Sequence, residues 1–245
     1  MRYLIISDIH ANQAALVSVL ADAGSFDLIW CLGDLVGYGP DPNECIDRLC
    51  DLPHFSLAGN HDWAALGKLD LTSFNSDARI SSIWTQTELT PASRVYLDDL
   101  STHVTKGQFT MAHASPRQPV WEYVLDPLIA QRSFAYFETP FCLVGHTHVP
   151  VIFYQSNDNP ERCRTLAPPY NGPIYLEEIN GRMILNPGSV GQPRDGNPYA
   201  SYAILDTDAM TWEHRRVPYA IEITQERMRA RGLPPRLIER LDYGR

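Results

Sequence analysis

MRYLIISDIHAN, residues 1–12, is an apolar run that passes directly into a cluster of polar side chains. Residues 2–7 have the short, continuous apolar composition of a buried strand. Residues 12–23 place Leu16, Val19 and Leu20 at helical spacing. We therefore expect a strand, a loop and a helix, with the polar residues in the loop just beyond the strand.

The same order of elements recurs further along the chain. The apolar run DLIWCL (27–32) precedes the Gly- and Pro-rich loop GDLVGYGPDP (33–42) and a helix-compatible segment at 43–50. A third apolar run, HFSLAG (54–59), ends at the polar residues NHDW (60–63). This alternation predicts α/β layering with a parallel sheet whose carboxyl strand ends carry the polar motifs.

The second half of the chain has a different pattern. Strand-like runs with Gly and Pro turns fill residues 174–217, so we expect the sheet to become antiparallel or mixed there. Residues 70–100 predict a helical insert of two helices interrupted near Pro91, and residues 221–240 predict a helical C-terminal tail. A length of 245 residues with 44% hydrophobic composition fits one domain over residues 1–245.

Composition narrows the function classes. No signal peptide is evident and the longest apolar runs are strand-sized, so we expect a soluble, cytoplasmic protein that binds no membrane. The five cysteines lack the paired spacing of a zinc ribbon, which favours reduced thiols. A net charge of −9 argues against general nucleic-acid binding, because such binding needs many Lys and Arg contacts. Any phosphate recognition must therefore be local.

Residue types that bind metals follow several of the strand-like runs, and five of the eight histidines lie in these loops. The candidate ligands are Asp8, His10, Asp34, Asn60, His113, His146 and His148. In an extended segment, side chains two residues apart point the same way, so Asp8 and His10 can face one ion, as can His146 and His148. Mixed carboxylate and imidazole ligands favour Mn, Fe, Zn, Co or Ni over Ca. Asp34, alone at its strand end, is placed to bridge two such ions.

The motifs also resemble those of a known family. SDIHAN (7–12), GDLVGYGP (33–40), GNHD (59–62), the lone His113 and GHTH (145–148) resemble, in order, the motif series of the calcineurin-like metallophosphoesterase superfamily. The segment NPGSVGQPRDG (186–196) is similar to the small bacterial phosphodiesterase and phosphatase branch whose first motif reads DIHGN. The resemblance covers residues up to about 205. It implies a four-layer α/β/β/α sandwich of two mixed sheets flanked by helices.

The resemblance also implies a site and a reaction. Asp8, His10 and His148 would hold one divalent ion, Asn60, His113 and His146 the other, and Asp34 would bridge them. His61 would be the catalytic histidine that protonates the leaving oxygen or stabilises its charge. The implied activity is hydrolysis of a small phosphate ester by metal-activated water. The ester could be a phosphodiester, a phosphomonoester or a nucleotide polyphosphate, and the oligomeric state is not predicted.

Departures from the family pattern bear on the alternatives. Gly37 and Tyr38 stand where the GDxxDRG motif of protein serine/threonine phosphatases has its second Asp and its Arg, which disfavours a protein phosphatase without excluding it. A non-catalytic interaction protein on the same fold is disfavoured because His61 and all seven ligands are present. Ala11 replaces the Gly that is usual in the closer branch, a change that restricts the loop backbone.

Candidate substrate contacts have competing interpretations. Asn12 could donate to phosphate or cap the helix that follows it, and Arg194 is favoured over Arg117 as the phosphate-binding arginine. Four aromatic residues near the motifs could line a nucleobase pocket or simply pack in the core: Tyr38, Trp63, Trp121 and Tyr123. The histidines outside the motifs are interpreted as structural or surface residues: His54, His103 and His214.

Overall fold

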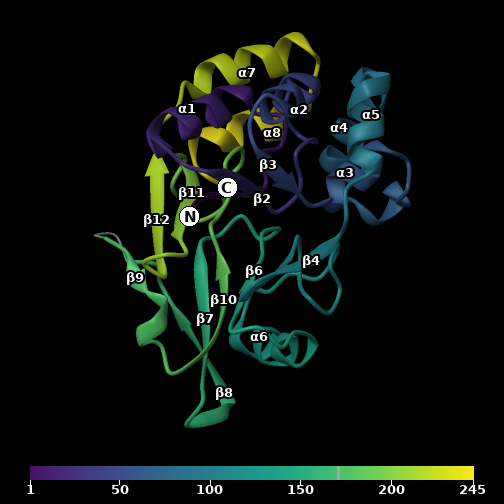
Figure 1. Cartoon of the computed structure of the whole chain (residues 1–245). Helices are drawn as coiled ribbons and strands as arrows, with labels where there is room; N and C mark the ends of the chain where they lie inside the picture. Colours follow the sequence, from purple (N-terminus) through teal and green to yellow (C-terminus); the bar gives the residue numbers. More distant parts are fainter. Residues whose placement is uncertain (170–171) are drawn as a thin grey trace.

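The computed structural model describes residues 1–169 and 172–245, and within them two six-stranded sheets pack face to face (Figure 1). The first sheet has the order β3 (His54–Ser56), β2 (Leu28–Cys31), β1 (Arg2–Ile6), β11 (Ala200–Asp206), β12 (Thr211–Val217) and β9 (Ile174–Tyr175). The second has the order β4 (His103–Lys106), β5 (Phe109–Ala112), β6 (Phe141–Leu143), β10 (Gly181–Asn186), β7 (Val151–Ser156) and β8 (Asn159–Leu166).

Both sheets are mixed, as the family resemblance implies. The strands β1, β2 and β3 are mutually parallel, whereas β11 and β12 run antiparallel to their neighbours. In the second sheet β5, β6 and β10 are parallel and the outer strands are antiparallel. The parallel strands therefore direct their carboxyl ends toward one edge of each sheet.

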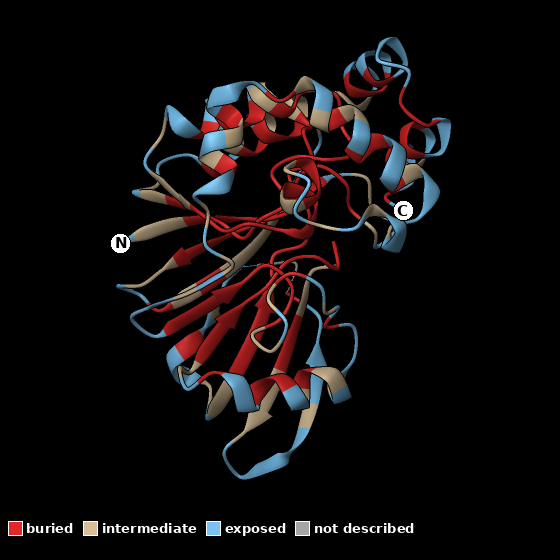
Figure 2. Cartoon of the chain, turned by 90° about the vertical axis from the view of Figure 1, so that its right-hand side faces the viewer, coloured by how far each residue is buried: buried red, intermediate tan, exposed pale blue. Residues whose placement is uncertain are grey.

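Helices cover the outer faces of the two sheets and complete four layers (Figures 1 and 2). The first sheet is covered by α1 (Gln13–Ala23), α2 (Pro42–Cys50), α7 (Ile221–Ala230) and α8 (Pro235–Glu239), and the second by α6 (Pro127–Ser133). Three further helices form a group beside the first sheet: α3 (Asn60–Ala65), α4 (Ser76–Glu88) and α5 (Pro91–Asp98). Short 3-10 turns lie at Leu71–Ser73, Phe134–Tyr136, Leu176–Glu178 and Arg240–Asp242.

The core has separate layers on either side of the first sheet. Leu4 and Ile6 of β1 pack toward the helices, and Ile5 packs toward the second sheet with Trp30 and Trp212. Because side chains alternate along a strand, β1 is buried on both faces and its sequence is apolar at every position from 4 to 6. Figure 2 shows this burial in the strands and in the inward faces of the helices.

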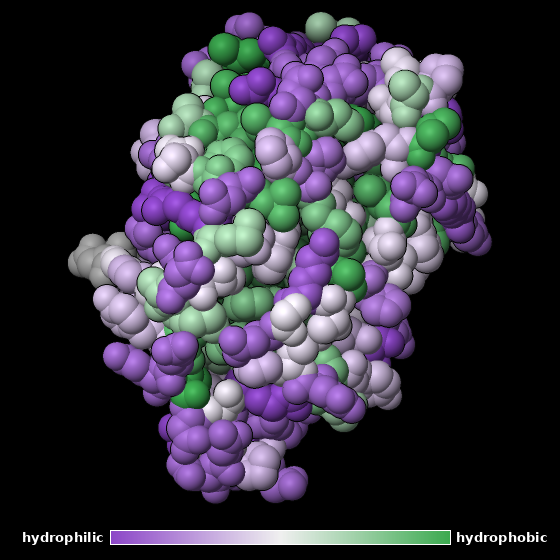
Figure 3. Space-filling view, viewed as in Figure 1, coloured by the Kyte–Doolittle hydropathy of each residue, from purple (hydrophilic) through white to green (hydrophobic). Residues whose placement is uncertain are grey.

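The helical segments agree with the sequence. The insert contains α4 and α5, which are separated before Pro91, where Thr90 caps α5 through its side chain. The tail contains α7 and α8 with Gly232 between them. The short helix α6 was not predicted from the sequence. The β7–β8 hairpin, at the bottom of Figure 1, presents an exposed and hydrophilic surface (Figure 3).

Two smaller expectations can also be compared with the structure. The five cysteines, all within the described residues, are free, as expected for reduced thiols. No helix in the described part of the chain is long and apolar enough to cross a bilayer.

Candidate metal site

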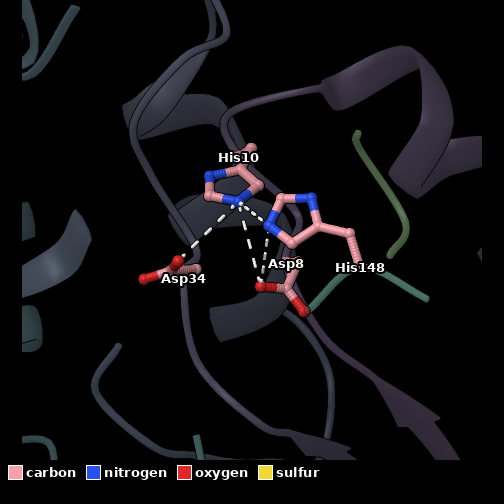
Figure 4. Close-up of side chains that lie close together, drawn as sticks. All are labelled: Asp8, His10, Asp34 and His148. Atoms are coloured by element: carbon pink, nitrogen blue, oxygen red, sulfur yellow. Dashed lines mark hydrogen bonds and ion pairs between the residues drawn. The ribbon is translucent and has the colours of Figure 1, made fainter. Parts of the chain in front are cut away.

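The candidate ligands converge because each follows the carboxyl end of a parallel strand. Asp8 follows β1 and Asp34 follows β2 in the first sheet, while His113 follows β5 in the second. Asn60 begins α3 after β3, and the pair His146 and His148 follows β6. The two sheets face each other, so their strand-end loops meet between them (Figure 4). All seven ligand side chains are at most 3% exposed.

The loops reach this geometry through left-handed backbone, not through the extended segments that the sequence analysis assumed. Asp8 has φ 54° and His10 has φ 49°, and His146 and His148 have φ 63° and 60°. The expectation that extended spacing aligns each pair is therefore wrong, although the paired residues do lie in one cluster. Ala11 also has positive φ (52°), a conformation that costs a residue with a Cβ roughly 1–2 kcal/mol. Such strain indicates that the surrounding contacts hold the loop in place.

Two groups of ligand atoms share Asp34. In the first group, Asp8, His10, Asp34 and His148 each offer one ligand atom within 4.8 Å of the others (Figure 4). In the second group, Asp34, His113 and His146 do the same. The Oδ2 of Asp34 lies 3.7 Å from His10 Nε2 and 3.3 Å from His113 Nε2, between the two groups.

Three oxygen atoms of the candidate ligands have no hydrogen-bond partner in the described part of the chain, which shows whether these groups fit metal ions. Asp8 Oδ1, Asp34 Oδ2 and Asn60 Oδ1 are buried, and none has a hydrogen-bond partner among the described residues. A buried polar atom left unpaired costs about 1–3 kcal/mol, so three together need an explanation. The other carboxylate oxygens are satisfied, because Asp8 Oδ2 accepts from His146 N (3.1 Å) and Asp34 Oδ1 from His61 N (2.8 Å). The free oxygens are thus the ones available to cations.

Backbone carbonyls fix which nitrogen each histidine presents. His10 Nδ1 lies 3.1 Å from Val36 O, and His113 Nδ1 lies 2.9 Å from Leu32 O. His148 Nδ1 is bonded to Gln192 O, whereas His146 uses Nε2 toward Trp121 O. A ring nitrogen that donates to a carbonyl leaves the opposite nitrogen with a lone pair, an arrangement common around metals. Thus Nε2 of three histidines and Nδ1 of His146 face inward.

The inward-facing ring nitrogens lie in two close pairs, although two nitrogen lone pairs that face each other without a cation between them repel. His10 Nε2 is 3.1 Å from His148 Nε2, and His113 Nε2 is 3.2 Å from His146 Nδ1. These separations are shorter than twice the usual nitrogen-to-metal distance of about 2.1 Å, so both nitrogens of each pair can bind one ion. The donor set therefore fits divalent metal ions.

The comparisons with known proteins place the chain in a family. Residues 1–210 match the family model described as the calcineurin-like phosphoesterase superfamily domain. The chain belongs to this superfamily. An uncharacterized protein of Methanocaldococcus jannaschii is 39% identical over 248 residues, covering 98% of this chain and 97% of that protein.

Solved structures agree with this membership. The crystal structure of a metallophosphoesterase from Sphaerobacter thermophilus is 46% identical, with a TM-score of 0.90 over 100% of this chain and 99% of that one. A hypothetical protein from Pyrococcus horikoshii OT3 has a TM-score of 0.80 at 18% identity over 100% and 98% of the two chains, which shows the shared fold. The predicted family and its sandwich of two mixed sheets are thereby confirmed.

Burial and charge pairing set the protonation of this phosphoesterase site in the absence of metal. Burial raises the pKa of Asp8 to about 7. Burial opposes the charged form of His113, but the neighbouring Asp34 carboxylate raises its pKa to about 9. Burial also opposes ionisation of Asp34, yet the charge of His113 holds the Asp34 pKa well below its usual range. Burial lowers the pKa of His146 to about 3, so its inward nitrogen is unprotonated near neutral pH.

His61 lies beside both ligand groups. Its backbone N–H donates to Asp34 Oδ1, and its ring centroid is 4.3 Å from that of Tyr38 and 5.0 Å from that of His10. Burial lowers the pKa of His61 to about 4, so the imidazole is neutral near pH 7. The ring also meets Phe74 edge-on at 5.3 Å. Phe74 belongs to the insert at 70–100, for which only helices were predicted from the sequence.

Asp62, the last residue of GNHD, has a structural role that the sequence analysis missed. Its carboxylate accepts hydrogen bonds from the backbone N–H groups of Asp34 (2.9 Å), Leu35 (2.9 Å), Val36 (3.1 Å) and Gly59 (2.8 Å). These bonds join the loop after β2 to the loop after β3. The ligands Asp34 and Asn60 are thereby held in one rigid unit, and the signal was the acidic residue within the motif itself.

The two candidate arginines differ in their surroundings. Arg194 donates from Nε to Gln192 Oε1 (2.9 Å) and from Nη2 to the Tyr38 hydroxyl (3.3 Å). Its charge also contributes to lowering the pKa values of His10, His61 and His148, which places it at the site. Arg117 instead forms a salt bridge with Glu122, so its charge is neutralised. Arg194 therefore lies near the candidate ligands, and its contact with phosphate stays a prediction.

Asn12 has the role of a helix cap. Its Oδ1 accepts from Ala15 N (3.1 Å) and from the Thr224 hydroxyl (2.8 Å), and its Nδ2 donates to Gly191 O (2.9 Å). The side chain is only 1% exposed and its polar atoms are bonded within the protein. The structure shows the capping alternative, which joins α1 to α7 and to the Gly191 loop, and phosphate binding by Asn12 stays a prediction.

The remaining aromatic and histidine residues divide between the site and the scaffold. Tyr38 contacts His10 and His61, and Tyr123 stacks on His146 with ring centroids 3.8 Å apart. Trp121 meets Phe74, whereas Trp63 makes no ring contact within the described residues. The scaffold histidines bond to nearby polar groups: His54 to Leu52 O and the Tyr96 hydroxyl, His103 to Thr102, and His214 to Ser201.

Proposed function

We propose that this phosphoesterase hydrolyses a small phosphate ester at a dinuclear site. Asp8, His10 and His148 hold one divalent transition-metal ion, Asn60, His113 and His146 hold the other, and Asp34 bridges them. The observation that carries the proposal is the position of Asp34 Oδ2, a buried and otherwise unpaired oxygen within 3.3–3.7 Å of a histidine nitrogen in each ligand group. The seven ligands come from five separate loops that meet only in the folded chain.

The bound ions would supply Lewis acidity and a water of lowered pKa to the reacting phosphate. Arg194 binds non-bridging phosphate oxygens, because its guanidinium is held beside the ligand groups by Gln192 and Tyr38. His61, held by Asp34 through its backbone and neutral near pH 7, gives a hydrogen bond to the oxygen that leaves, and gives a proton to it only in the protonated form of the ring. Each group is fixed before substrate arrives, which is the condition for electrostatic catalysis.

Gly37 explains why this site differs from that of the protein phosphatases. A Cβ at Gly37 would lie 2.6 Å from His61 Nδ1, and the glycine has φ 86°. An aspartate at this position would thus collide with the ring that it supports in those enzymes. Phe74 contacts the His61 ring and Trp121, and Tyr123 stacks on His146; these bulky rings against the candidate site favour a small ester over a phosphorylated protein.

We expect Gly37→Ala to lower kcat at least about 10-fold, because the new methyl group and the left-handed backbone both displace His61. Metal content should stay at the wild-type level, since position 37 offers no ligand. Gly24→Ala is the matched control, because Gly24 also has positive φ but has open space around it. Equal activity in the two variants would show that His61 needs no such clearance.

Metal affinity should rise with pH up to about 9. His113 has a raised pKa of about 9 and Asp8 one of about 7, and both must lose a proton before they bind an ion. Between pH 7 and 9 one proton should leave as metal binds, so affinity should change about tenfold per pH unit, and below pH 7 more steeply. Calorimetric titration of Mn²⁺ in buffers of different ionisation enthalpy counts these protons. A metal affinity that stays constant from pH 6 to 9 would contradict the expectation that His113 and Asp8 lose protons when metal binds.

The proposed activity can be separated from its alternatives in one assay panel. We expect protein loaded with Mn, Fe, Zn, Co or Ni in parallel to hydrolyse bis-para-nitrophenyl phosphate or small nucleotides, and to act poorly on phosphopeptides. Preferential hydrolysis of phosphopeptides would support a protein phosphatase. Absence of hydrolysis with every metal and substrate would favour a non-catalytic interaction protein on the same fold.

A further inference from the structure

A basic pocket lies between the beginning of α4 and the C-terminal tail. It has a volume of about 350 Å³ and is lined by Asn75, Ser76, Asp77, Arg236, Arg240 and Arg245. Three arginines face one aspartate there, whereas the chain as a whole has a net charge of −9. Because α4 begins in the pocket wall, the positive end of its helix dipole adds to this charge. The pocket is therefore suited to an anion.

Arg240 lacks partners for part of its guanidinium. Its Nε and Nη2 atoms are buried and have no hydrogen-bond partner within the described residues. The guanidinium lies over the ring of Tyr38, with Cζ 4.5 Å from the ring centroid. Burial of a charged group is costly unless it is paired, and its buried surroundings lower the pKa of Arg240 to about 10. A ligand with anionic oxygens would satisfy these donors.

Tyr38 connects this pocket with the metal ligands. Its ring contacts His61 and His10 and also lies under Arg240, and its hydroxyl accepts from Arg194. The charge of Arg240 contributes to lowering the pKa values of His61 and His148, so the pocket and the site share one electrostatic environment. The backbone ties them as well, because Gln192 Nε2 donates to Arg245 O at 2.5 Å.

We propose that the Arg236–Arg240–Arg245 pocket binds a second phosphate group of the substrate whose first phosphate is hydrolysed at the metal site. The inference rests on the proposed function and narrows it to esters that carry a further phosphate or diphosphate group. Guanidinium groups bind phosphate oxygens through paired, charge-assisted hydrogen bonds, and Arg240, which lines the pocket, has two buried donors without a partner among the described residues. Asp77 lies 4.0 Å from Arg236. Its single negative charge repels an anion and therefore limits the affinity of the pocket for phosphate.

Binding of inorganic pyrophosphate to metal-free protein tests the pocket without turnover. We expect measurable binding by calorimetry in a chelator-treated sample, and a loss of at least about 10-fold in affinity for Arg240→Gln. Arg236→Ala and Arg245→Ala should each weaken binding several-fold, and they keep the test valid if Arg240→Gln fails to fold. Arg229→Ala is the matched control, because Arg229 is exposed on α7 and does not line the pocket.

The outcomes separate this inference from the proposed function. If pyrophosphate fails to bind, or binds equally to wild type and to the three pocket variants, the pocket assignment is overturned even when bis-para-nitrophenyl phosphate is hydrolysed. If binding depends on the pocket arginines while no ester is hydrolysed with any metal, the anion pocket stands and the proposed function fails.

Discussion

Asp34→Asn is expected to lower turnover at least about 100-fold, because the replacement removes the one carboxylate that both ligand groups share. The Asn oxygen can keep the bond from the His61 backbone, which leaves an amide N–H₂ pointing at the position of the ions. A donor at that position repels a cation. Bound metal should therefore fall below the wild-type amount as well.

Activity on bis-para-nitrophenyl phosphate and metal content by elemental analysis measure this effect. Asp47→Asn, on the exposed face of α2, is the matched control with the same chemical change. Wild-type activity in Asp34→Asn would remove the bridging carboxylate from the mechanism. A fall in activity without any change in bound metal would assign Asp34 to substrate positioning instead.

His61→Ala should lower kcat at least about 100-fold while bound metal stays at the wild-type level. The separation is expected because His61 belongs to neither ligand group, although its backbone contacts Asp34. His61→Gln, which keeps a hydrogen-bond donor, should recover part of the loss if His61 acts by hydrogen bonding. Little recovery would point to proton transfer.

The His61 experiment needs a control variant, and two of its outcomes would contradict the assignment. His103→Ala changes an exposed histidine on β4 and should leave kcat unaltered. Loss of metal in His61→Ala would mean that the imidazole is a ligand, and unchanged kcat would mean that it takes no part in the reaction. Either result would require a new assignment of Asn60 and His61.

The fold and the convergence of the candidate ligands could be predicted because they follow from local signals. Each ligand comes directly after an apolar strand, and parallel strands bring their carboxyl ends to one edge. The residue types then indicate the chemistry. The backbone geometry was not predictable in the same way, since the left-handed turns at Asp8 and His10 depend on hydrogen bonds with the loops after β2 and β10.

Residues that reach the site from distant segments escaped the sequence analysis for a physical reason. Phe74 and Arg240 come from the insert and the tail, and their positions depend on tertiary packing and not on periodicity. Asn12 was recognised in the sequence, but its role was not decided by the sequence. Its sequence position suited both phosphate binding and helix capping, and the contacts with Thr224 and Gly191 that accompany capping are visible only in the structure.

The number of metal ions per chain tests the central claim most directly. Equilibrium dialysis of the wild-type protein against saturating Mn²⁺, followed by elemental analysis, should give two ions per chain, one for each ligand group that shares Asp34. A saturating value of one ion, or of none, would contradict the dinuclear site.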